Sequence, residues 1–574
     1  MAEFAVWGPE VRRLRIRLTG RDVELAPDGD GWWRASVPAA GPGTDYGYLV
    51  DDSDEVLPDP RSAWQPHGVH GPSRVYDHAA FAWTDAGWRG RALAGSVLYE
   101  LHVGTFTPEG TFDAAIGRLD HLVDLGVDLV ELLPVNAFNG VHGWGYDGVC
   151  WFAPHEPYGG PDGLKRLVDA CHARGLGVII DAVYNHFGPS GAYPPRFAPY
   201  LASGENTWGR SINLDGPGSD EVRRYIIDSA LGWLRDYHAD GLRLDAVHAL
   251  VDRRAVHLLE ELAAAVDALS ARLGRPLTLV AESDLNDPRL ITPRAAGGYG
   301  LHAQWNDDAH HALHALLTGE RQGYYGDFGS LDCLATVLTG AFFHAGTWSS
   351  FRKRTHGRPV DRALTPGYRF VAYLQNHDQI GNRATGDRLS ASLSPGLLRV
   401  GATLLLTAPF TPMLFMGEEW GATTPWQFFS SHPEPSLGRA VAEGRRREFG
   451  AHGWPAGEVP DPQDPDTFAR SRLDWAEPDK SPHRELLDLY RRLIRLRRDR
   501  PDLADPRLDR VAVAVGDQTL VVRRGSTVVA ANLAPDPRRI ALRGDILLAT
   551  EPGVTAAGGA VDLPPESAAV LTLP

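Results

Sequence analysis

Between residues 97 and 416 the chain alternates short apolar runs with longer stretches in which apolar residues recur at helical spacing. Apolar runs of about four to eight residues predict buried strands, and recurrence every three or four residues predicts amphipathic helices. Eight runs, with helices such as 221–237 and 255–273 between them, predict an α/β chain built around a closed (β/α)8 TIM barrel. The runs lie at 97–103, 129–135, 177–183, 241–247, 277–281, 302–305, 370–374 and 413–416. Thr111 is expected to cap a helix that carries Ile116, Leu119, Leu122 and Val123 on one face.

Alternating apolar and polar residues mark both ends of the chain. Residues 14–18, 33–37 and 46–50 alternate in this way between Gly, Pro and Asp turns, which predicts a small immunoglobulin-like β-sandwich. After an Arg- and Leu-rich helix at 482–498, the alternation returns at 511–515, 519–522 and 528–531. With Pro501 as a boundary, we expect an N-terminal β-sandwich at 1–90, the barrel at 91–500 and a C-terminal β-sandwich domain at 501–574.

Three of the predicted strands end at a carboxylate. Their apolar runs break into Asp245, Glu282 and Asp378. A single strand-end Asp is more often a helix cap than a catalytic group, but parallel barrel strands end at one rim, where three acids converge. A nucleophilic carboxylate, a proton-donating acid with a raised pKa and a third acid that holds the substrate suit glycoside hydrolysis. The sequence therefore predicts a glycosidase site at this rim.

Arg243 and Asp181 are expected to support these acids. Arg243 stands two residues before Asp245, on the same face of the strand, where its guanidinium can hold the nucleophile ionised; the alternative is a purely structural buried ion pair. Asp181 is expected to bond its neighbours and preserve the shape of the site. With Asn185 and His186 it could instead bind calcium, but the chain lacks an acidic loop to complete such a site, so no metal is expected.

Composition narrows the partners and the compartment. A net charge of -16 disfavours nucleic acid and an anionic membrane as partners, whereas it leaves the binding of a neutral sugar unaffected. The first residues lack a basic and apolar leader, and no apolar run approaches the roughly 20 residues of a membrane span. Cys150, Cys171 and Cys333 lack the spacing of a disulfide framework or a zinc site. We therefore expect a cytoplasmic protein without a cofactor.

The strand-end segments, together with Asp-Ala-Val-Tyr-Asn-His at 181–186, resemble the four signature regions of the α-amylase superfamily (glycoside hydrolase family 13), in that family's order. The resemblance covers the whole barrel. It implies that Asp245 is the nucleophile of a covalent glycosyl intermediate, that Glu282 is general acid and then base, and that Asp378 stabilises the transition state. Net retention of the α-configuration follows, with nucleophile and acid about 5 to 5.5 Å apart.

The same resemblance implies residues that bind sugar. It places His186 and His377 at the subsite of the attacked glucose and makes Tyr146 the aromatic residue on which that glucose stacks. His248 stands where many amylases carry a Lys that contacts the leaving-side sugars, so the leaving side is expected to differ. Candidates for hydrogen bonds on that side follow the sixth predicted strand: Asn306, Asp307, Asp308 and His310. One of the two aspartates is also expected to cap the next helix.

Four further stretches resemble the superfamily members that hydrolyse the α-1,4 bond beside a terminal trehalose, which releases trehalose and a shortened maltooligosaccharide. They are 59–73, 303–311, 319–328 and 460–475. The N-terminal sandwich is similar to the carbohydrate-binding-module-like domain of glycogen-branching enzymes, so transfer of a glucan to a 6-hydroxyl is the alternative reaction. A noncatalytic glucan-binding protein is disfavoured because all three acids are present. The resemblance also implies a partner enzyme that first converts the reducing-end linkage to α-1,1.

Overall fold

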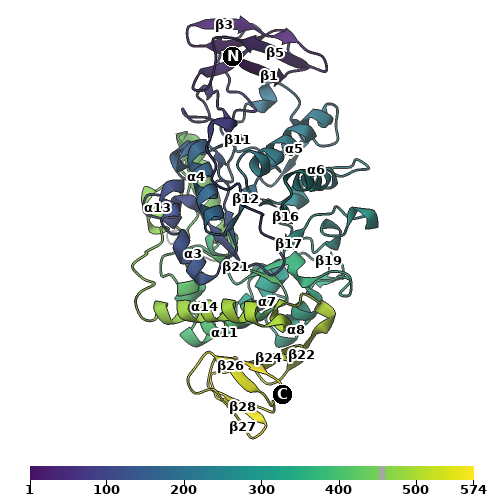
Figure 1. Ribbon diagram of the computed structural model, residues 1–574, viewed down its shortest axis with the longest axis vertical. Coiled ribbons are helices and arrows are strands. Elements are labelled where there is room, and N and C mark those ends of the chain that lie inside the picture. Colours follow the sequence, from purple (N-terminus) through teal and green to yellow (C-terminus); the bar gives the residue numbers. More distant parts are fainter. Residues whose placement is uncertain (452–458) are drawn as a thin grey trace.

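The centre of the molecule is a closed barrel of parallel strands (Figure 1). The computed structural model describes residues 1–451 and 459–574, and in it the barrel has eight strands, with β21 pairing with β8 to close the ring. In chain order they are β8 (Leu98–Leu101), β9 (Leu129–Leu132), β12 (Gly177–Ala182), β15 (Gly241–Leu244), β16 (Thr278–Ala281), β17 (Ala303–Trp305), β20 (Phe370–Tyr373) and β21 (Thr411–Phe415). Each strand overlaps one predicted run, so the predicted (β/α)8 fold is confirmed.

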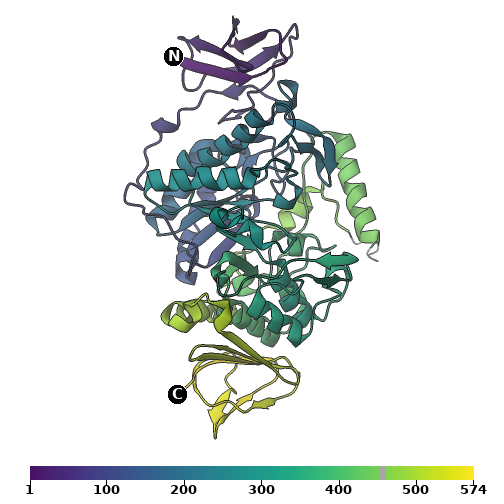
Figure 2. The same cartoon turned by 90° about the vertical axis from the view of Figure 1, so that its right-hand side faces the viewer.

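Helices cover the outside of the barrel (Figures 1 and 2). The larger ones are α4 (Gly160–Ala173), α5 (Ser219–Arg235), α6 (Leu258–Leu273), α7 (Asp307–Thr318), α8 (Leu331–Gly340), α11 (Pro395–Thr407), α12 (Pro435–Ala451) and α14 (His483–Asp499). In α5 the buried residues Val222, Ile226 and Trp233 recur at helical spacing, so one side packs on the barrel while the other faces solvent. Within the described residues, no helix combines the length and apolarity that crossing a membrane would require.

The helix expected after Thr111 is two helices. Thr111 does cap the first, because its hydroxyl accepts a hydrogen bond from the amide of Ala114 at 3.2 Å. That helix, α2 (Phe112–Ile116), has Gly117 as its C-cap, and α3 (Leu119–Leu125) follows as a separate helix after Arg118. The single apolar face was therefore wrong in part: Leu119 and Leu122 are buried, whereas Val123 is 42% exposed.

Shorter elements occupy the loops between barrel strands and helices. They are α1 (Val103–Phe106), β10 (Asn136–Ala137), β11 (Cys150–Pro154), β13 (Leu201–Asn206), β14 (Gly209–Ile212), β18 (Thr347–Ser349), β19 (Arg354–His356), α9 (His377–Gly381), α10 (Leu389–Ser392), α13 (Pro465–Arg470) and α15 (Pro501–Ala504). The pairs β13–β14 and β18–β19 are antiparallel hairpins. These loop elements carry much of the candidate site described below.

Two β-sheets at the N-terminus form the predicted sandwich. One contains β1 (Ala2–Trp7), β5 (Trp32–Val37) and β4 (Ala26–Pro27), and the other β3 (Arg21–Glu24), β2 (Leu14–Leu18), β6 (Asp45–Val50) and β7 (Ser73–Arg74). The three runs predicted in this region all fall on strands. Phe4, Ile16 and Tyr48 are buried between the sheets, because alternate residues of each strand point inward.

The C-terminal domain is also built from two sheets. A five-stranded sheet contains β22 (Val511–Val515), β23 (Thr519–Arg524), β24 (Thr527–Asn532), β29 (Ser567–Thr572) and β26 (Asp545–Ala549), and a smaller sheet contains β25 (Arg538–Ile540), β28 (Ala560–Leu563) and β27 (Thr555–Ala557). Ala530, Ala569 and Val561 belong to the apolar core between them. The two flanking domains lie at opposite ends of the molecule, with the barrel domain between them (Figures 1 and 2).

Candidate active site

The acids predicted from the sequence meet at the carboxyl end of the barrel. Asp181 lies in β12, while Asp245 follows β15 directly and Glu282 follows β16 directly. Asp378 lies in α9, which begins soon after β20. Asp181 and Arg243 are register partners on neighbouring strands. Because all these strands run in the same direction, their carboxyl ends deliver the side chains to one rim.

Arg243 links three of the carboxylates. Its Nη1 donates to Asp181 Oδ1 at 2.8 Å and to Asp245 Oδ1 at 2.7 Å, and its Nη2 lies 3.5 Å from Glu282 Oε2. The guanidinium is fully buried, 4.3 Å from the centre of the Trp305 ring. Burial would lower the pKa of Arg243, but the carboxylates, led by Asp181, raise it well above its ordinary value. A permanent cation is therefore shared among three acids.

Asp245 is held through both of its carboxylate oxygens. Oδ1 accepts from Arg243, and Oδ2 accepts from Nδ2 of Asn185 at 2.6 Å. Hydrogen bonds to a charged acceptor are stronger than neutral ones, and two of them from different elements fix the carboxylate plane. The side chain remains 12% exposed, so a reacting atom can approach it from the rim.

Glu282 is arranged to carry a proton. Burial raises its pKa to about 8; Arg243 opposes this shift, whereas the negative charges of Asp245 and Asp378 add to it. At neutral pH the group is therefore mainly the acid. Its Oε2 accepts a hydrogen bond from the backbone amide of Ala246, the residue directly after Asp245. Ala246 has a left-handed backbone (φ 40°), which is uncommon for a residue with a side chain.

His377, Tyr146 and Asp378 form the side of the site next to β20. The Tyr146 hydroxyl donates to Asp181 at 2.6 Å and lies 2.7 Å from Nε2 of His377, whose ring stacks on Tyr146. Burial alone would lower the pKa of His377, but the carboxylates of Asp378 and Glu100 raise it to about 9. The protonated His377 thus donates from Nε2 to Tyr146. Asp378 is 40% exposed and faces the open rim.

His186 and His248 lie on another side, beside the β13–β14 hairpin. Nδ1 of His186 bonds Oδ1 of Asn185, and the His186 ring stacks with that of Trp208 at 6.0 Å. His248 lies in the short turn after Asp245, 6.3 Å from the same tryptophan ring. Trp208 is 48% exposed, so the hairpin presents an aromatic face to the rim. Sequence reasoning missed Trp208, which has no strand-end motif around it.

Comparisons with known proteins agree with this geometry. The family "Alpha amylase, catalytic domain" matches residues 72–198, and a domain of unknown function (DUF3459) matches residues 506–570. The malto-oligosyltrehalose trehalohydrolase of Rhizobium sp. (strain M-11) is 59% identical over 99% of this chain and 97% of its own length. That of Arthrobacter ramosus is 61% identical over 95% of both chains. The chain belongs to the malto-oligosyltrehalose trehalohydrolase family.

Likeness in structure extends over the whole molecule. A crystal structure from Salmonella typhimurium described as an alpha amylase has a TM-score of 0.91 and 38% sequence identity, covering 100% of this chain and 97% of that one. Pullulanase from Anoxybacillus sp. LM18-11 has a TM-score of 0.74 at 18% identity, which shows a shared fold only. A branching enzyme of Geobacillus stearothermophilus is 28% identical over 74% of this chain, so the branching alternative is not favoured over the trehalohydrolase family.

Three of the four residues expected to contact the leaving sugars are buried, and their side chains form hydrogen bonds inside the protein. Asn306, and neither aspartate, caps α7: its Oδ1 accepts from the Ala309 amide at 3.2 Å. Its Nδ2 donates to Ala341 O at 2.9 Å, and the residue is fully buried. Both polar groups of the Asn306 side chain are thus bonded within the protein, and its sugar contact stays a prediction. A cap needs a side-chain oxygen level with the N3 amide, and the residue before the helix supplies it.

Asp308 and His310 also point into the protein. Asp308 Oδ2 accepts from the amides of Phe343 and His344, at 2.8 and 2.9 Å, which ties the segment after α8 to α7. His310 is 1% exposed and its Nε2 lies 3.0 Å from the Tyr325 hydroxyl. Asp308 also lines the pocket that Asp307 lines, whereas His310 does not; the direct role of both residues on the leaving side stays a prediction.

Asp307 remains a candidate for contact with the leaving sugars. It lines a pocket beside the acids together with Asp284, Tyr324, Phe351 and Arg352. Its Oδ1 accepts from the Tyr373 hydroxyl. Burial raises the pKa of Asp307 to about 7. Sequence reasoning missed the other four: Asp284 lies just beyond the strand end at Glu282, and the remaining three lie in segment 319–356, which carries none of the predicted barrel strands.

The donors weighed as a calcium site are engaged in hydrogen bonds within the protein. Asn185 is engaged with Asp245 and His186, and Asp181 with Arg243 and Tyr146. The contacts give this segment a role without metal: Asn185 bonds Asp245 directly, and Asp181 is linked to Asp245 through Arg243.

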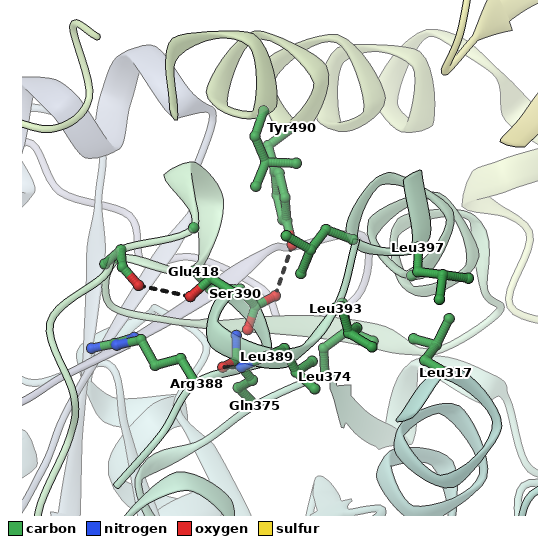
Figure 3. Close-up of a pocket in the computed structure, with 16 residues that line it drawn as sticks. Leu317, Leu374, Gln375, Arg388, Leu389, Ser390, Leu393, Leu397, Glu418 and Tyr490 are labelled. Carbon is green, nitrogen blue, oxygen red and sulfur yellow. Dashed lines mark hydrogen bonds between the residues drawn. The ribbon is translucent and has the colours of Figure 1, made fainter. Parts of the chain in front are cut away.

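A second buried carboxylate lies outside this site. Glu418 follows β21 and accepts from the hydroxyl of Tyr490 on α14 at 3.1 Å, in a small pocket that Arg388 also lines (Figure 3). Burial raises the pKa of Glu418 to about 8. None of the acids at the rim lines this pocket. We therefore assign Glu418 to the packing of α14 on the barrel.

Proposed function

We propose that this chain hydrolyses the α-1,4-glucosidic bond beside the terminal trehalose of a malto-oligosyltrehalose, with retention of configuration. One observation carries the mechanism. Arg243 lies between Asp245, a carboxylate whose two oxygens each accept a hydrogen bond, and Glu282, an acid that is mainly protonated at neutral pH. The trehalohydrolases to which the chain is 54–61% identical support the substrate. Together they favour an enzyme over a glucan-binding protein.

In the first step Asp245 attacks the anomeric carbon while Glu282 gives its proton to the glycosidic oxygen. The bond to trehalose breaks and an ester forms between Asp245 and the maltooligosaccharide. Asp245 loses its negative charge in this step, which removes one of the interactions that raise the pKa of Glu282. The pKa of Glu282 therefore falls once its proton has left, and Arg243 stabilises the resulting carboxylate.

In the second step Glu282 acts as the base. As a carboxylate it takes a proton from a water molecule that enters where trehalose has left, and this water attacks the anomeric carbon. Asp245 is released and the maltooligosaccharide leaves with its original α-configuration. Asp378 faces the rim, where its charge stabilises the positive charge that develops on the sugar in both transition states.

Sugar binding is assigned to the groups around the acids. We propose that Tyr146, His186 and His377 hold the attacked glucose, and that His248 and Asp307 face the trehalose. Trehalose differs from the end of an ordinary maltooligosaccharide because it has no reducing end. Directional hydrogen bonds can distinguish the two, whereas apolar contacts discriminate weakly between similar sugars. Asp307, whose pKa lies near neutrality, can donate or accept such a bond.

The proposed partner and compartment follow from the substrate. A malto-oligosyltrehalose synthase must supply the α-1,1 linkage, so we propose that it works in the same cytoplasm. The described cysteines, Cys150, Cys171 and Cys333, are all free and buried, which fits a reducing compartment. The net charge of -16 continues to disfavour nucleic acid as a partner.

A product assay tests this function. Maltopentaosyl-trehalose, maltoheptaose and amylose are incubated separately with the protein, and chromatography separates trehalose from reducing sugars. We expect trehalose from the first substrate and little product from the other two. New α-1,6 branches on amylose without trehalose would move the chain to the branching enzymes. Proton NMR of the first products tests retention, which predicts the α-anomer.

A further inference from the structure

One buried carboxylate of the barrel is bonded to the site without lying at its rim. Glu100 is in β8 and is 1% exposed. Its Oε1 lies 2.6 Å from Nδ1 of His377, and its Oε2 accepts from the backbone amide of the same residue at 3.0 Å. Both oxygens of Glu100 are thus devoted to one histidine.

This double contact orients the imidazole. With Nδ1–H directed at Glu100, the other ring nitrogen, Nε2, is directed at Tyr146 at 2.7 Å and lies 3.5 Å from Asp378 Oδ2. The backbone bond fixes the first residue of α9, a helix of only five residues that also carries Asp378. Glu100 therefore sets the position of a helix as well as that of a ring.

A neighbouring acid provides a natural comparison. Glu131 is the register partner of Glu100 on β9 and is equally buried at 1% exposure. No hydrogen bond to His377 is found for it among the described residues, and its Oε2 has no partner there. Burial raises the pKa of Glu131 well above its ordinary value, with the charge of Glu100 adding to this. Glu131 is thus neutral beside a Glu100 that is bonded to a cation.

We infer that Glu100 is a positioning residue for the reaction, because it holds His377 as a doubly protonated ring with Nε2–H directed at Tyr146 and the sugar site. The inference rests on the proposed function in one respect, the placement of the attacked glucose beside His377. It extends that function to a residue on β8, four strands around the barrel from the strand that Glu282 follows. Removal of Glu100 should weaken substrate binding and should shift the pH at which binding is lost.

Several titratable or charged groups face His377, and each can influence its charge. They come from several elements and comprise Glu100 on β8, His102 after β8, Glu131 on β9, Tyr146 in the β10–β11 loop, Arg243 on β15 and Asp378 on α9. Of these, Glu100 alone among the described residues bonds Nδ1. Arg243 opposes the proton on His377, so the carboxylates must outweigh it.

The test uses a background in which turnover is strongly slowed. In Glu282→Gln, calorimetry measures the Kd of maltopentaosyl-trehalose from pH 6 to 10, and then again after Glu100→Gln or Glu131→Gln is added. With Glu100 and Glu131 both present, substrate binding should hold up to about pH 9, where His377 loses its proton. Glu100→Gln should weaken binding at pH 7 by about 10- to 100-fold, the usual effect of losing a charge-assisted bond, and should move the loss of binding at least one pH unit lower.

Glu131→Gln replaces one neutral group with another and should leave both the Kd and its pH profile unchanged. Glu100→Asp keeps the carboxylate, so it should restore part of the binding and return the pH profile toward that of the parent. Thermal unfolding curves first establish that both variants are folded. Identical pH profiles of Kd for the Glu100→Gln and Glu131→Gln variants would then overturn the inference. Trehalose release by Glu282→Gln at a rate near that of the parent would refute the proposed acid instead; the Glu100 comparison would then be made on KM and its pH dependence.

Discussion

Replacing Glu282 with Gln is the most direct test of the proposed chemistry. Gln keeps the size and one hydrogen-bond acceptor of the side chain, so the bond from the Ala246 amide can survive, but it has no proton to donate. General acid catalysis is worth about 10²- to 10⁴-fold in rate, or about 2.7 to 5.4 kcal/mol at 1.36 kcal/mol per factor of ten. We expect kcat on malto-oligosyltrehalose to fall by that factor, with a smaller change in KM.

The pH profile adds a second, independent magnitude. With a pKa of about 8, Glu282 is protonated in about nine molecules of ten at pH 7 and in about one of ten at pH 9. The activity of the parent should therefore fall about tenfold per pH unit above pH 8, whereas the residual activity of the variant should lack this limb. Trehalose release is measured between pH 5 and 10 for both proteins.

A substrate that needs no acid isolates the role of Glu282. Fluoride leaves a glycosyl fluoride without full protonation, so formation of the glycosyl intermediate from a maltosyl fluoride should be slowed far less than hydrolysis of the natural substrate. Arg470→Gln, on the exterior of α13, serves as a control that alters a charge away from the rim. Equal losses on both substrates, or an alkaline limb that persists in the variant, would refute the assignment of Glu282 as the acid.

Three other outcomes are expected. Asp245→Asn should abolish the mass increase that an activated fluoro-sugar produces in the parent; labelling that persisted would place the nucleophile elsewhere. Because its folded pKa is raised, Glu282 contributes stability that is present below about pH 4.5 and lost as the pH rises through about 8, so Glu282→Gln should gain in Tm relative to the parent over this range, which calorimetry checks. Arg524→Met removes buried donors to the carbonyls of Thr407, Ala408 and Leu503, and should lower the free energy of unfolding by about 2 to 4 kcal/mol in denaturant titrations, with kcat/KM unchanged at 25 °C. An unaltered unfolding midpoint would contradict that last estimate.

The fold and the acids could be predicted because both leave strong marks in the sequence. A buried parallel strand is an apolar run, and Asp245 and Glu282 stand where such runs stop. Arg243 was predictable as well, since two residues along a strand return to the same face. These inferences need only the period of the chain and the direction of the strands.

The partners of those acids could not be predicted in the same way. Asn306 looks like a sugar ligand in sequence, yet its position just before α7 makes it the cap. Trp208 and Phe351 belong to hairpins whose path depends on tertiary contacts, so no local period announces them. Glu100 did leave a signal, because a carboxyl group inside a buried apolar strand must either find a partner or stay protonated. The identity of that partner, 277 residues away along the chain, required the closed barrel.

Closure of the barrel has a consequence for how the activity of this protein changes during unfolding and refolding. Glu100 and His377 meet only after β21 has paired with β8, and Arg243 receives its carboxylates only when β12, β15 and β16 lie in register. A folding intermediate with an open sheet therefore lacks the contact between Glu100 and His377, even where β12, β15 and β16 already lie in register. Residual activity during denaturation should therefore report the fraction of molecules in which the barrel is closed.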